Sequence, residues 1–237
     1  DGAGGSNHGF LGGKCANFAL SDALMHDYSL RQAFALADKD VSVNAYGGYA
    51  TGVSTVIDSG YKVLLGSKGD SRALTIRDGE IMIPGTTKLH SKVAYEIEEG
   101  TLPAKAIHTS KSKHIVCSVI GNIKKPLFET WFQGKPGDQM ILASDGLWDV
   151  VSDYEILKFA QNLRGQRLQK AIYQLAYERN NSTESFQIEF AMNDFISMQP
   201  FYVKGRKTSG DNITVLVIDI ANNHAEFKKK AAKQLPF

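Results

Sequence analysis

The stretch QMILASDGLWDVVSDYE, residues 139–155, predicts a strand that leads through an acidic turn into a helix. Its first part, Gln139 to Ser144, is mostly apolar and is typical of a buried strand. Ser152, with Glu155 three residues later, forms a capping box that begins a helix at Asp153. The chain therefore changes from strand to helix here, and the turn between the two elements carries carboxylates.

Two of these carboxylates are four residues apart, so a helical turn would place Asp145 and Asp149 on one face. Like charges at that spacing repel each other unless a cation lies between them, which favours a metal site over a packing role. Asp also stands beside Gly at other predicted strand edges, in Asp1-Gly2, Gly69-Asp70 and Gly210-Asp211. One such pair is usually only a turn, but four together predict oxygen ligands for a hard divalent cation.

Helical patterns stand on both sides of a strand-rich middle region. Helices are predicted over 10–25, 30–43, 91–99, 153–163, 168–179 and near 186–195. Strands are predicted over 51–57, 61–65, 73–76, 80–83, 114–119, 127–131, 139–144 and 213–220. Short turns such as Asp78-Gly79 join the first four strands, which favours an antiparallel meander.

The composition is that of an ordinary globular protein of 237 residues, with 43% hydrophobic and 22% charged residues. These fractions exclude a disordered chain, a collagen-like repeat and a disulfide scaffold. A formal net charge of +2 gives no reason to expect nucleic acid or a membrane as a partner. Cys15 and Cys117 fit no metal spacing, so we expect reduced thiols and a cytoplasmic location.

Four short blocks stand at the acidic turns, and they are DGAGG at 1–5, GDSRA at 69–73, SDGLWDV at 144–150 and GDNITV at 210–215. In this order they resemble the signature blocks of the metal-dependent protein phosphatases of the protein phosphatase 2C type. The order and spacing make the resemblance specific, and it runs from Asp1 to about Ile220. A softer match over 87–121 is similar to the flap region of the bacterial members.

The resemblance implies an α+β fold, an α-β-β-α four-layer sandwich of two mostly antiparallel sheets flanked by helices. It implies a single protein phosphatase 2C-like domain over 1–237 that lacks its N-terminal strand. The stretch 84–112 would form a flap-like excursion, and 180–207 would be a variable insertion that we interpret as a surface loop.

The resemblance also implies a centre of two Mg²⁺ or Mn²⁺ ions and a third, weaker ion. The implied metal ligands are Asp1, Gly2, Asp145, Asp211, Asp70 and Asp149. Asp1 would bridge the core ions, and the Gly2 carbonyl would bind one of them. Asp70 and Asp149 would belong to the third ion. The cations would lower the pKa of a bridging water, so that hydroxide attacks phosphorus without a phosphoenzyme.

The general acid is not identified by the sequence. Ala3 stands where many relatives carry His or Met, and alanine cannot donate a proton, which leaves His8 as a candidate. The family's phosphate-clamping Arg and an acidic pair lie on a strand before the first motif, and the sequence lacks this strand. Asn212 is expected to orient its turn, and Arg72 to form a structural ion pair.

These features favour a metal-dependent protein serine/threonine phosphatase whose partners are phosphorylated protein substrates. Two alternatives stay open. One is a catalytically inactive phosphatase-like scaffold or regulatory binding protein, although such proteins usually lose the core carboxylates that this chain keeps. The other is a phosphatase for a small phosphorylated metabolite, which the chemistry of the site alone does not separate from the first hypothesis.

Overall fold

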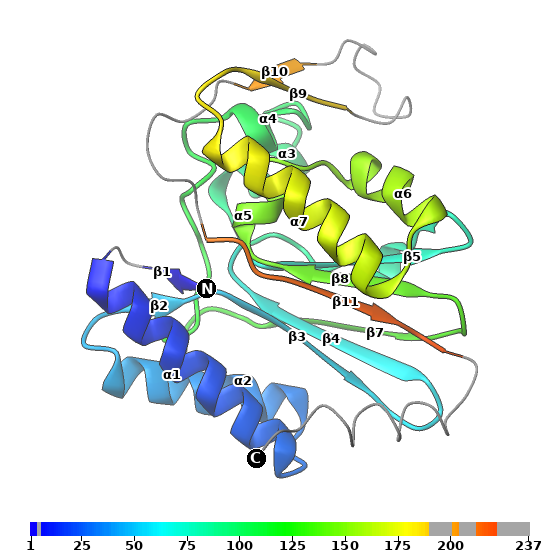
Figure 1. Cartoon of the computed structure of the whole chain (residues 1–237). Helices are drawn as coiled ribbons and strands as arrows, with labels where there is room; N and C mark the ends of the chain where they lie inside the picture. The colour runs from blue at the N-terminus through cyan, green and yellow to red at the C-terminus, as the bar shows by residue number, and fades with distance from the viewer. Residues whose placement is uncertain (4–5, 190–200, 204–211, 222–237) are drawn as a thin grey trace.

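A computed structural model of the chain describes residues 1–3, 6–189, 201–203 and 212–221. Two antiparallel sheets face each other, and pairs of helices cover both outer surfaces (Figure 1). The α-β-β-α sandwich expected from the resemblance is thereby confirmed. The N-terminus lies at one end of this sandwich.

The helices fall into three groups. One outer surface is covered by α1 (Ser6–Met25) and α2 (Leu30–Asn44), and the other by α6 (Asp153–Asn162) and α7 (Gly165–Asn181), with the short α5 (Asp145–Trp148) beside them. A third group of short helices comprises η1 (Ile83–Gly85), α3 (Lys92–Glu98) and α4 (Ala106–Thr109). Among the residues that the structure describes, no helix is long and apolar enough to cross a membrane.

The two main sheets are antiparallel throughout. The sheet next to α1 and α2 has the order β3-β4-β7, with β3 (Gly52–Ile57), β4 (Lys62–Lys68) and β7 (Phe128–Gln133). The other has the order β11-β8-β5-β6, with β5 (Arg72–Arg77), β6 (Glu80–Ile81), β8 (Gln139–Ala143) and β11 (Val215–Asp219). Two ribbons pair β1 (Gly2–Ala3) with β2 (Tyr49–Ala50), and β9 (Phe186–Ile188) with β10 (Phe201–Val203).

The expected four-stranded meander over 51–83 is wrong. β3 pairs with β4 and β5 pairs with β6, but β4 has β7 as its second neighbour and β5 has β8. The chain passes from one sheet to the other at Gly69, whose φ of 98° favours glycine. The Gly69-Asp70 turn therefore connects the two sheets instead of joining neighbouring strands.

Apolar side chains fill the spaces between the four layers. Between the sheets, Val63 and Leu65 of β4 lie with Met140 and Leu142 of β8. The space beneath α2 is filled around Phe34. The space beneath α6 and α7 holds buried Leu74, Ile141, Leu147, Ile156, Leu168 and Ile172. Burial of each side chain of this size contributes roughly 1.5–3 kcal/mol to the free energy of folding. The core therefore fixes the strands, and with them the turns at the ends of the sheets.

The predicted capping box at the start of α6 is confirmed. The Ser152 side chain accepts from the Glu155 N–H at 3.2 Å, and the Glu155 carboxylate accepts from the Ser152 N–H at 3.0 Å. These bonds satisfy backbone donors that have no partner inside the helix. They fix the first turn of α6 directly after the acidic turn.

Two predicted elements are wrong. In place of the expected strand over 114–119, the described chain has only an isolated bridge between Ser91 and Val116. The helix expected near 186–195 is contradicted over its described part, because Phe186–Ile188 form β9. Short apolar runs are ambiguous between helix and strand, and here the tertiary contacts decide.

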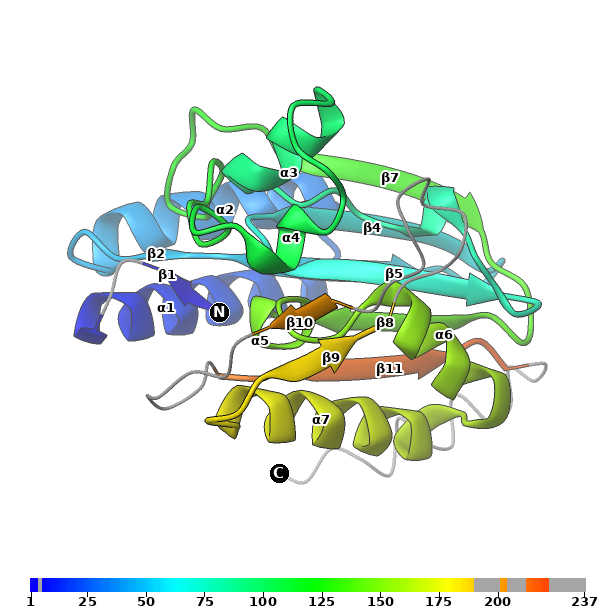
Figure 2. The same ribbon diagram turned by 90° about the horizontal axis from the view of Figure 1, so that it is seen from above.

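The stretch 84–112 contains α3 and α4, which lie at the same end of the sandwich as α5 (Figure 2). In the stretch 180–207, α7 continues to Asn181 and the ribbon of β9 and β10 follows. Residues 190–200 and 204–207 of that stretch lie outside the described ranges.

Candidate metal centre

The turn after β8 places Asp145 at the first position of α5, with its Oδ1 atom buried. The Asp149 N–H donates to the Asp145 carbonyl at 2.8 Å, so the two acids lie one helical turn apart, as predicted. Gly146 packs so closely on Asn212 that an added Cβ would lie 2.3 Å from the Asn212 carbonyl oxygen. Only glycine fits at this position, which gives the Asp-Gly pair a packing reason.

The last motif runs alongside this turn. The Ser144 N–H donates to the Thr214 carbonyl at 3.1 Å, and the Thr214 N–H donates to Ser144 Oγ at 3.1 Å. Ser144 Oγ also donates to the Asn212 carbonyl at 3.2 Å. These bonds orient the turn at Asn212 beside Asp145. The predicted ligand Asp211 is next in sequence and lies outside the described residues.

The first motif is held by Thr51. The Asp1 backbone nitrogen donates to the Thr51 carbonyl at 2.9 Å, and the Thr51 N–H donates to the Asp1 carbonyl at 2.9 Å. The Gly2 N–H donates to Asp1 Oδ1 at 2.7 Å, which orients the carboxylate. A Cβ added to Gly2 would lie 2.0 Å from the Gly9 carbonyl oxygen, so Gly2 is needed for the contact with α1.

Thr51 also contacts the second motif. A Cβ added to Gly69 would lie 2.4 Å from the Cβ of Thr51, and the Thr51 hydroxyl is hydrogen-bonded to the Ser71 hydroxyl at 2.9 Å. Asp70, between these residues, is buried. Thr51 therefore joins the Asp1 and Asp70 turns, a role that the sequence analysis missed because no local pattern marks it.

His90 ties the 84–112 excursion to the second motif. The backbone N–H of His90 donates to the Gly69 carbonyl at 2.8 Å, and the ring Nδ1 of His90 accepts from the Gly69 N–H at 3.2 Å. Burial lowers the pKa of His90, and the positive charges of Lys68 and Lys88 lower it further. The neutral ring with its proton on Nε2 is the form that can accept this hydrogen bond.

Three of the predicted ligands lie near one another. The carboxylates of Asp145 and Asp70 lie close enough to Asp1 to act electrostatically on its backbone nitrogen. Asp70, Asp145 and Asp149 line one cavity of about 430 Å³. The turns that carry these acids thus converge at one end of the sandwich, although they are far apart in sequence.

The donor set suits a hard divalent cation, because it consists of carboxylate oxygens and a backbone carbonyl. Over the described ranges, no group of three or more His, Cys, Asp or Glu residues is arranged to hold a metal ion. The proposed set of core ligands includes Asp211, which those ranges do not contain. The ligand assignments for Asp1, Gly2, Asp145, Asp211, Asp70 and Asp149 therefore stay predictions.

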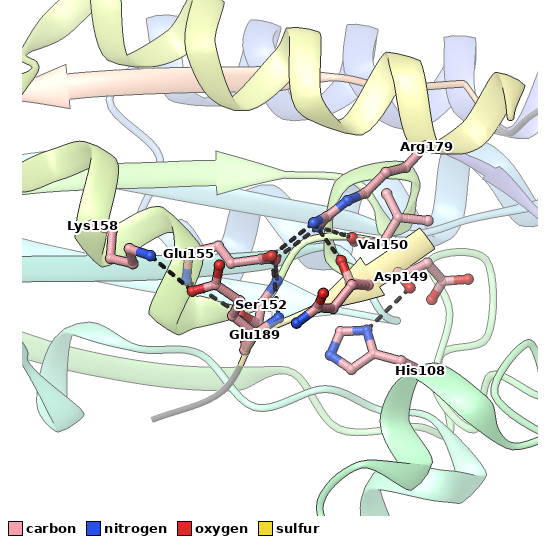
Figure 3. Close-up of polar contacts among 9 residues, drawn as sticks. His108, Asp149, Val150, Ser152, Glu155, Lys158, Arg179 and Glu189 are labelled. Carbon is pink, nitrogen blue, oxygen red and sulfur yellow. Dashed lines mark hydrogen bonds and ion pairs between the residues drawn. The ribbon is translucent and has the colours of Figure 1, made fainter. Parts of the chain in front are cut away.

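Asp149 has basic neighbours that no sequence pattern indicated. Lys113 Nζ lies 2.6 Å and His114 Nδ1 lies 3.7 Å from Asp149 Oδ2. His108 Nδ1 lies 3.0 Å from the Asp149 carbonyl oxygen (Figure 3). Burial lowers the pKa of His108 although the bond to Asp149 opposes this, so the neutral ring donates through Nδ1. Lys113 and His108 both line the cavity.

Arg72 forms the structural ion pair expected for it. Its Nη1 donates to Asp153 Oδ1 at 2.9 Å, and its Nη2 donates to Asp153 Oδ2. The guanidinium carbon lies 4.9 Å from the centroid of the Trp148 ring. This arrangement links β5 to α6 beside the cavity and engages the Arg72 charge with a carboxylate and an aromatic face.

A second arginine holds the chain just after α5. Arg179 Nη1 donates to the Val150 carbonyl at 2.7 Å, and both Nη atoms donate to the Glu155 carboxylate at 2.8 and 2.7 Å (Figure 3). Burial acts to raise the pKa of Glu155, but the bonds from Arg179 and the Ser152 N–H outweigh it and lower the pKa. The backbone next to Asp149 is therefore tied to α7.

His8, the candidate general acid, lies in α1 with an exposed side chain. It is not among the residues that line the described cavity, whereas His108 is. No sequence pattern marks His108, because a single histidine in a polar stretch has no recognisable partner nearby in the chain. Its position beside Asp149 follows from the path of the 84–112 excursion.

The chain is similar to known phosphatases. A sequence model of the family Protein phosphatase 2C matches residues 132–184. The serine/threonine protein phosphatase PstP of Mycobacterium tuberculosis is 30% identical over 115 residues, which cover 48% of this chain and 22% of PstP. Protein phosphatase 2C 53 of Oryza sativa subsp. japonica is 29% identical over 223 residues, which cover 84% of this chain and 48% of that protein.

A crystal structure of M. tuberculosis PstP has the same fold, with a TM-score of 0.70 and 22% identity over 94% of this chain and 86% of that chain. These findings bear out the resemblance to the protein phosphatase 2C type that the motifs indicate. It spans less than half the length of either curated relative.

Proposed function

We propose that this chain is the catalytic part of a metal-dependent protein serine/threonine phosphatase. The single observation that carries the proposal is the convergence of the Asp1, Asp70 and Asp145 turns, which come from distant parts of the sequence, at one end of the sandwich. Carboxylates placed together in this way repel one another unless cations compensate them. The similarity to PstP, a serine/threonine phosphatase, supports the same assignment.

Asp1, the Gly2 carbonyl, Asp145 and Asp211 would hold two Mg²⁺ or Mn²⁺ ions. A structure of the PstP catalytic domain is described as a complex with two manganese ions, which supports this choice of metal. When bound, such ions supply Lewis-acid chemistry, because they acidify water and neutralise charge on a phosphoryl group. The resemblance assigns Asp70 and Asp149 to a third, weaker ion.

The residues of the chain orient the site. The Gly2 N–H fixes Asp1 Oδ1 at 2.7 Å, and α5 presents Asp145 with its Oδ1 atom buried. Arg72 is engaged by Asp153 and Trp148, so it forms a wall of the cavity. Because its charge is already engaged there, Arg72 is not proposed as the group that binds phosphate.

The lining of the cavity favours a phosphorylated peptide over a polyhydroxylated metabolite. Apolar side chains stand beside the acids, and they include Ile81, Leu89, Ile107, Trp148, Val151 and Leu157. Such a surface gains free energy by covering the apolar atoms of a peptide, whereas sugar hydroxyls would lose hydrogen bonds to water there. Phosphoserine and phosphothreonine in proteins are accordingly the proposed substrates.

The test is hydrolysis of p-nitrophenyl phosphate and of phosphoserine and phosphothreonine peptides with Mn²⁺ present. Asp145→Asn should lower kcat by about 100-fold or more, because it removes the carboxylate charge that would hold the metal ions against the transition state. The matched control Asp22→Asn removes a carboxylate from exposed α1 and should leave kcat unchanged.

Three results would contradict the proposal in different ways. Turnover of Asp145→Asn at the wild-type rate would remove Asp145 from the site. Faster hydrolysis of sugar phosphates than of phosphopeptides would favour a metabolite phosphatase. The absence of both turnover and Mn²⁺ uptake by the wild type, joined to any segment that precedes Asp1 in the natural protein, would favour an inactive scaffold.

A further inference from the structure

The ion pair between Lys113 and Asp149 is largely withdrawn from solvent. Its Nζ and Oδ2 atoms lie 2.6 Å apart, and only 10% of the Lys113 side chain and 15% of the Asp149 side chain are exposed. A charge buried to this extent is costly unless an opposite charge compensates it. Each member of the pair therefore makes the burial of the other possible.

A second contact joins the same two parts of the chain. His108 Nδ1 donates to the Asp149 carbonyl at 3.0 Å, and a turn in which the Lys113 N–H donates to the Ser110 carbonyl at 3.4 Å follows α4. We call residues 106–113 the α4 segment. This segment binds Asp149 through both its carboxylate and its backbone carbonyl.

The other side of Asp149 is held by the body of the domain. Its N–H donates to the Asp145 carbonyl at 2.8 Å, and the next carbonyl, that of Val150, accepts from Arg179 at 2.7 Å (Figure 3). Since the turn is fixed from this side, the Lys113 contact restrains the α4 segment and does not set the position of the turn.

We propose that Lys113 is a positioning residue whose ammonium group is the resident cation of Asp149, in place of the third divalent ion, and that it latches the α4 segment over the cavity. A divalent ion at the same carboxylate would lie within a few ångströms of the ammonium charge, where like charges repel strongly. Asp149 is then the ion-pair partner of Lys113 and not a ligand of that ion. The statement about the third ion rests on the proposed metal-dependent function, whereas the latch does not.

Three variants of the full chain test this. Lys113→Met keeps the length of the side chain without its charge, Lys113→Arg keeps the charge, and Lys111→Met removes a charge from an exposed position of the same segment. Hydrogen exchange without added metal reports the latch. Amides of the α4 segment should exchange at least about tenfold faster in Lys113→Met, and near the wild-type rate in Lys113→Arg and Lys111→Met.

Titration with Mn²⁺, followed by the electron paramagnetic resonance of the free ion, counts the bound ions. Lys113→Met should bind one more ion per chain than the wild type, and a second change, Asp149→Asn, should remove that ion. Lys111→Met should match the wild type. A simple loss of stability would not add a binding site, so this count separates the proposed role from a structural one.

Either of two results overturns the proposal. Unchanged exchange of the α4 segment in Lys113→Met would show that no latch exists. A wild-type Mn²⁺ count that falls on Asp149→Asn, or no additional ion in Lys113→Met, would show that Lys113 does not stand in for a metal. Neither measurement requires turnover, so a failure of the phosphatase proposal is seen separately in the hydrolysis assay.

Discussion

Two lysine–aspartate ion pairs have the same distance between Nζ and Oδ2 but lie in different surroundings. Lys68 Nζ and Asp38 Oδ2 are 2.6 Å apart, with side chains only 2% and 8% exposed, and they lie where β4 packs on α2. Lys113 and Asp149 are also 2.6 Å apart, but they border the cavity. The same chemical contact therefore occurs once in the interior and once at the candidate site.

The interior pair has additional backbone partners. Lys68 Nζ also donates to the Asn122 carbonyl at 3.3 Å, and Asp38 Oδ1 accepts from the Gly121 N–H at 3.0 Å. Partners of this kind satisfy the buried charges and leave little freedom to exchange them for water. The comparison teaches that a buried ion pair with additional backbone partners is part of the packed core. An ion pair beside a cavity can instead separate without disrupting the core.

The largest effect is expected when the interior pair is broken. Lys68→Met leaves the Asp38 carboxylate buried without its cation and should lower the free energy of unfolding by ~3–5 kcal/mol. Urea denaturation measures this loss. The double variant Lys68→Met/Asp38→Asn should recover part of it, because no buried charge is then left. A loss below about 1 kcal/mol in the single variant would remove the distinction between the two pairs.

A smaller loss is expected at the cavity. Lys113→Met should lower the free energy of unfolding by ~1–3 kcal/mol, because water that enters from the cavity can solvate the remaining Asp149 charge. The same urea measurement checks it, with Lys111→Met as the exposed control. A cost equal to that of Lys68→Met would mean that the cavity pair is as enclosed as the interior one.

The pH dependence of stability extends the comparison of the two ion pairs, because the charge of Lys68 in the interior pair acts on His90. Its pKa is lowered in the folded state by burial first and then by Lys68 and Lys88. Its contribution to stability is therefore complete above the unfolded pKa of about 6.5 and is lost as the pH falls towards the folded pKa. For one proton the slope is at most about 1.4 kcal/mol per pH unit.

Replacement of His90 by asparagine should flatten this slope. The side-chain carbonyl of His90→Asn can still accept from the Gly69 N–H but does not titrate. Unfolding curves between pH 7 and pH 5, in about half-unit steps, provide the measurement, and His26→Asn in the exposed turn after α1 is the control. An unchanged slope in His90→Asn would mean that another group carries the acid sensitivity.

The smallest effect is expected at a surface pair. Arg31 Nη2 lies 2.5 Å from Glu129 Oε2, but 75% of the Arg31 side chain is exposed. Arg31→Met should change the free energy of unfolding by no more than ~1 kcal/mol, since water screens this contact. This value calibrates what removal of a basic side chain costs when burial plays no part. A loss that matches Lys113→Met would place the cavity pair among ordinary surface pairs.

The features that were predicted correctly from the sequence depend on residues close together in the chain. The capping box of Ser152 and Glu155 and the helical turn from Asp145 to Asp149 are examples. Caps and turns need only local backbone geometry, so their residue types can be recognised directly. The ordered motifs added the sandwich fold, which local periodicity alone does not specify.

The wrong predictions concern which distant segments meet. β4 and β5 follow each other in the chain but belong to different sheets, and Phe186–Ile188 form a strand because β10 lies beside them. Pairing of strands depends on neighbours that the local pattern does not contain. For the same reason, the roles of Thr51 and Lys113 could not be predicted, because their partners lie in turns far away in the sequence.

By itself, the sequence determined most helices, most strands and the set of acidic turns, because these follow from side-chain periodicity, capping and the conformational freedom of glycine. Only the tertiary structure decided that Thr51 joins two of those turns and that a lysine, Lys113, stands against Asp149. The physical reason is that the effect of a buried charge on stability and on binding depends on the groups in contact with it. The packing of the whole chain determines which groups these are.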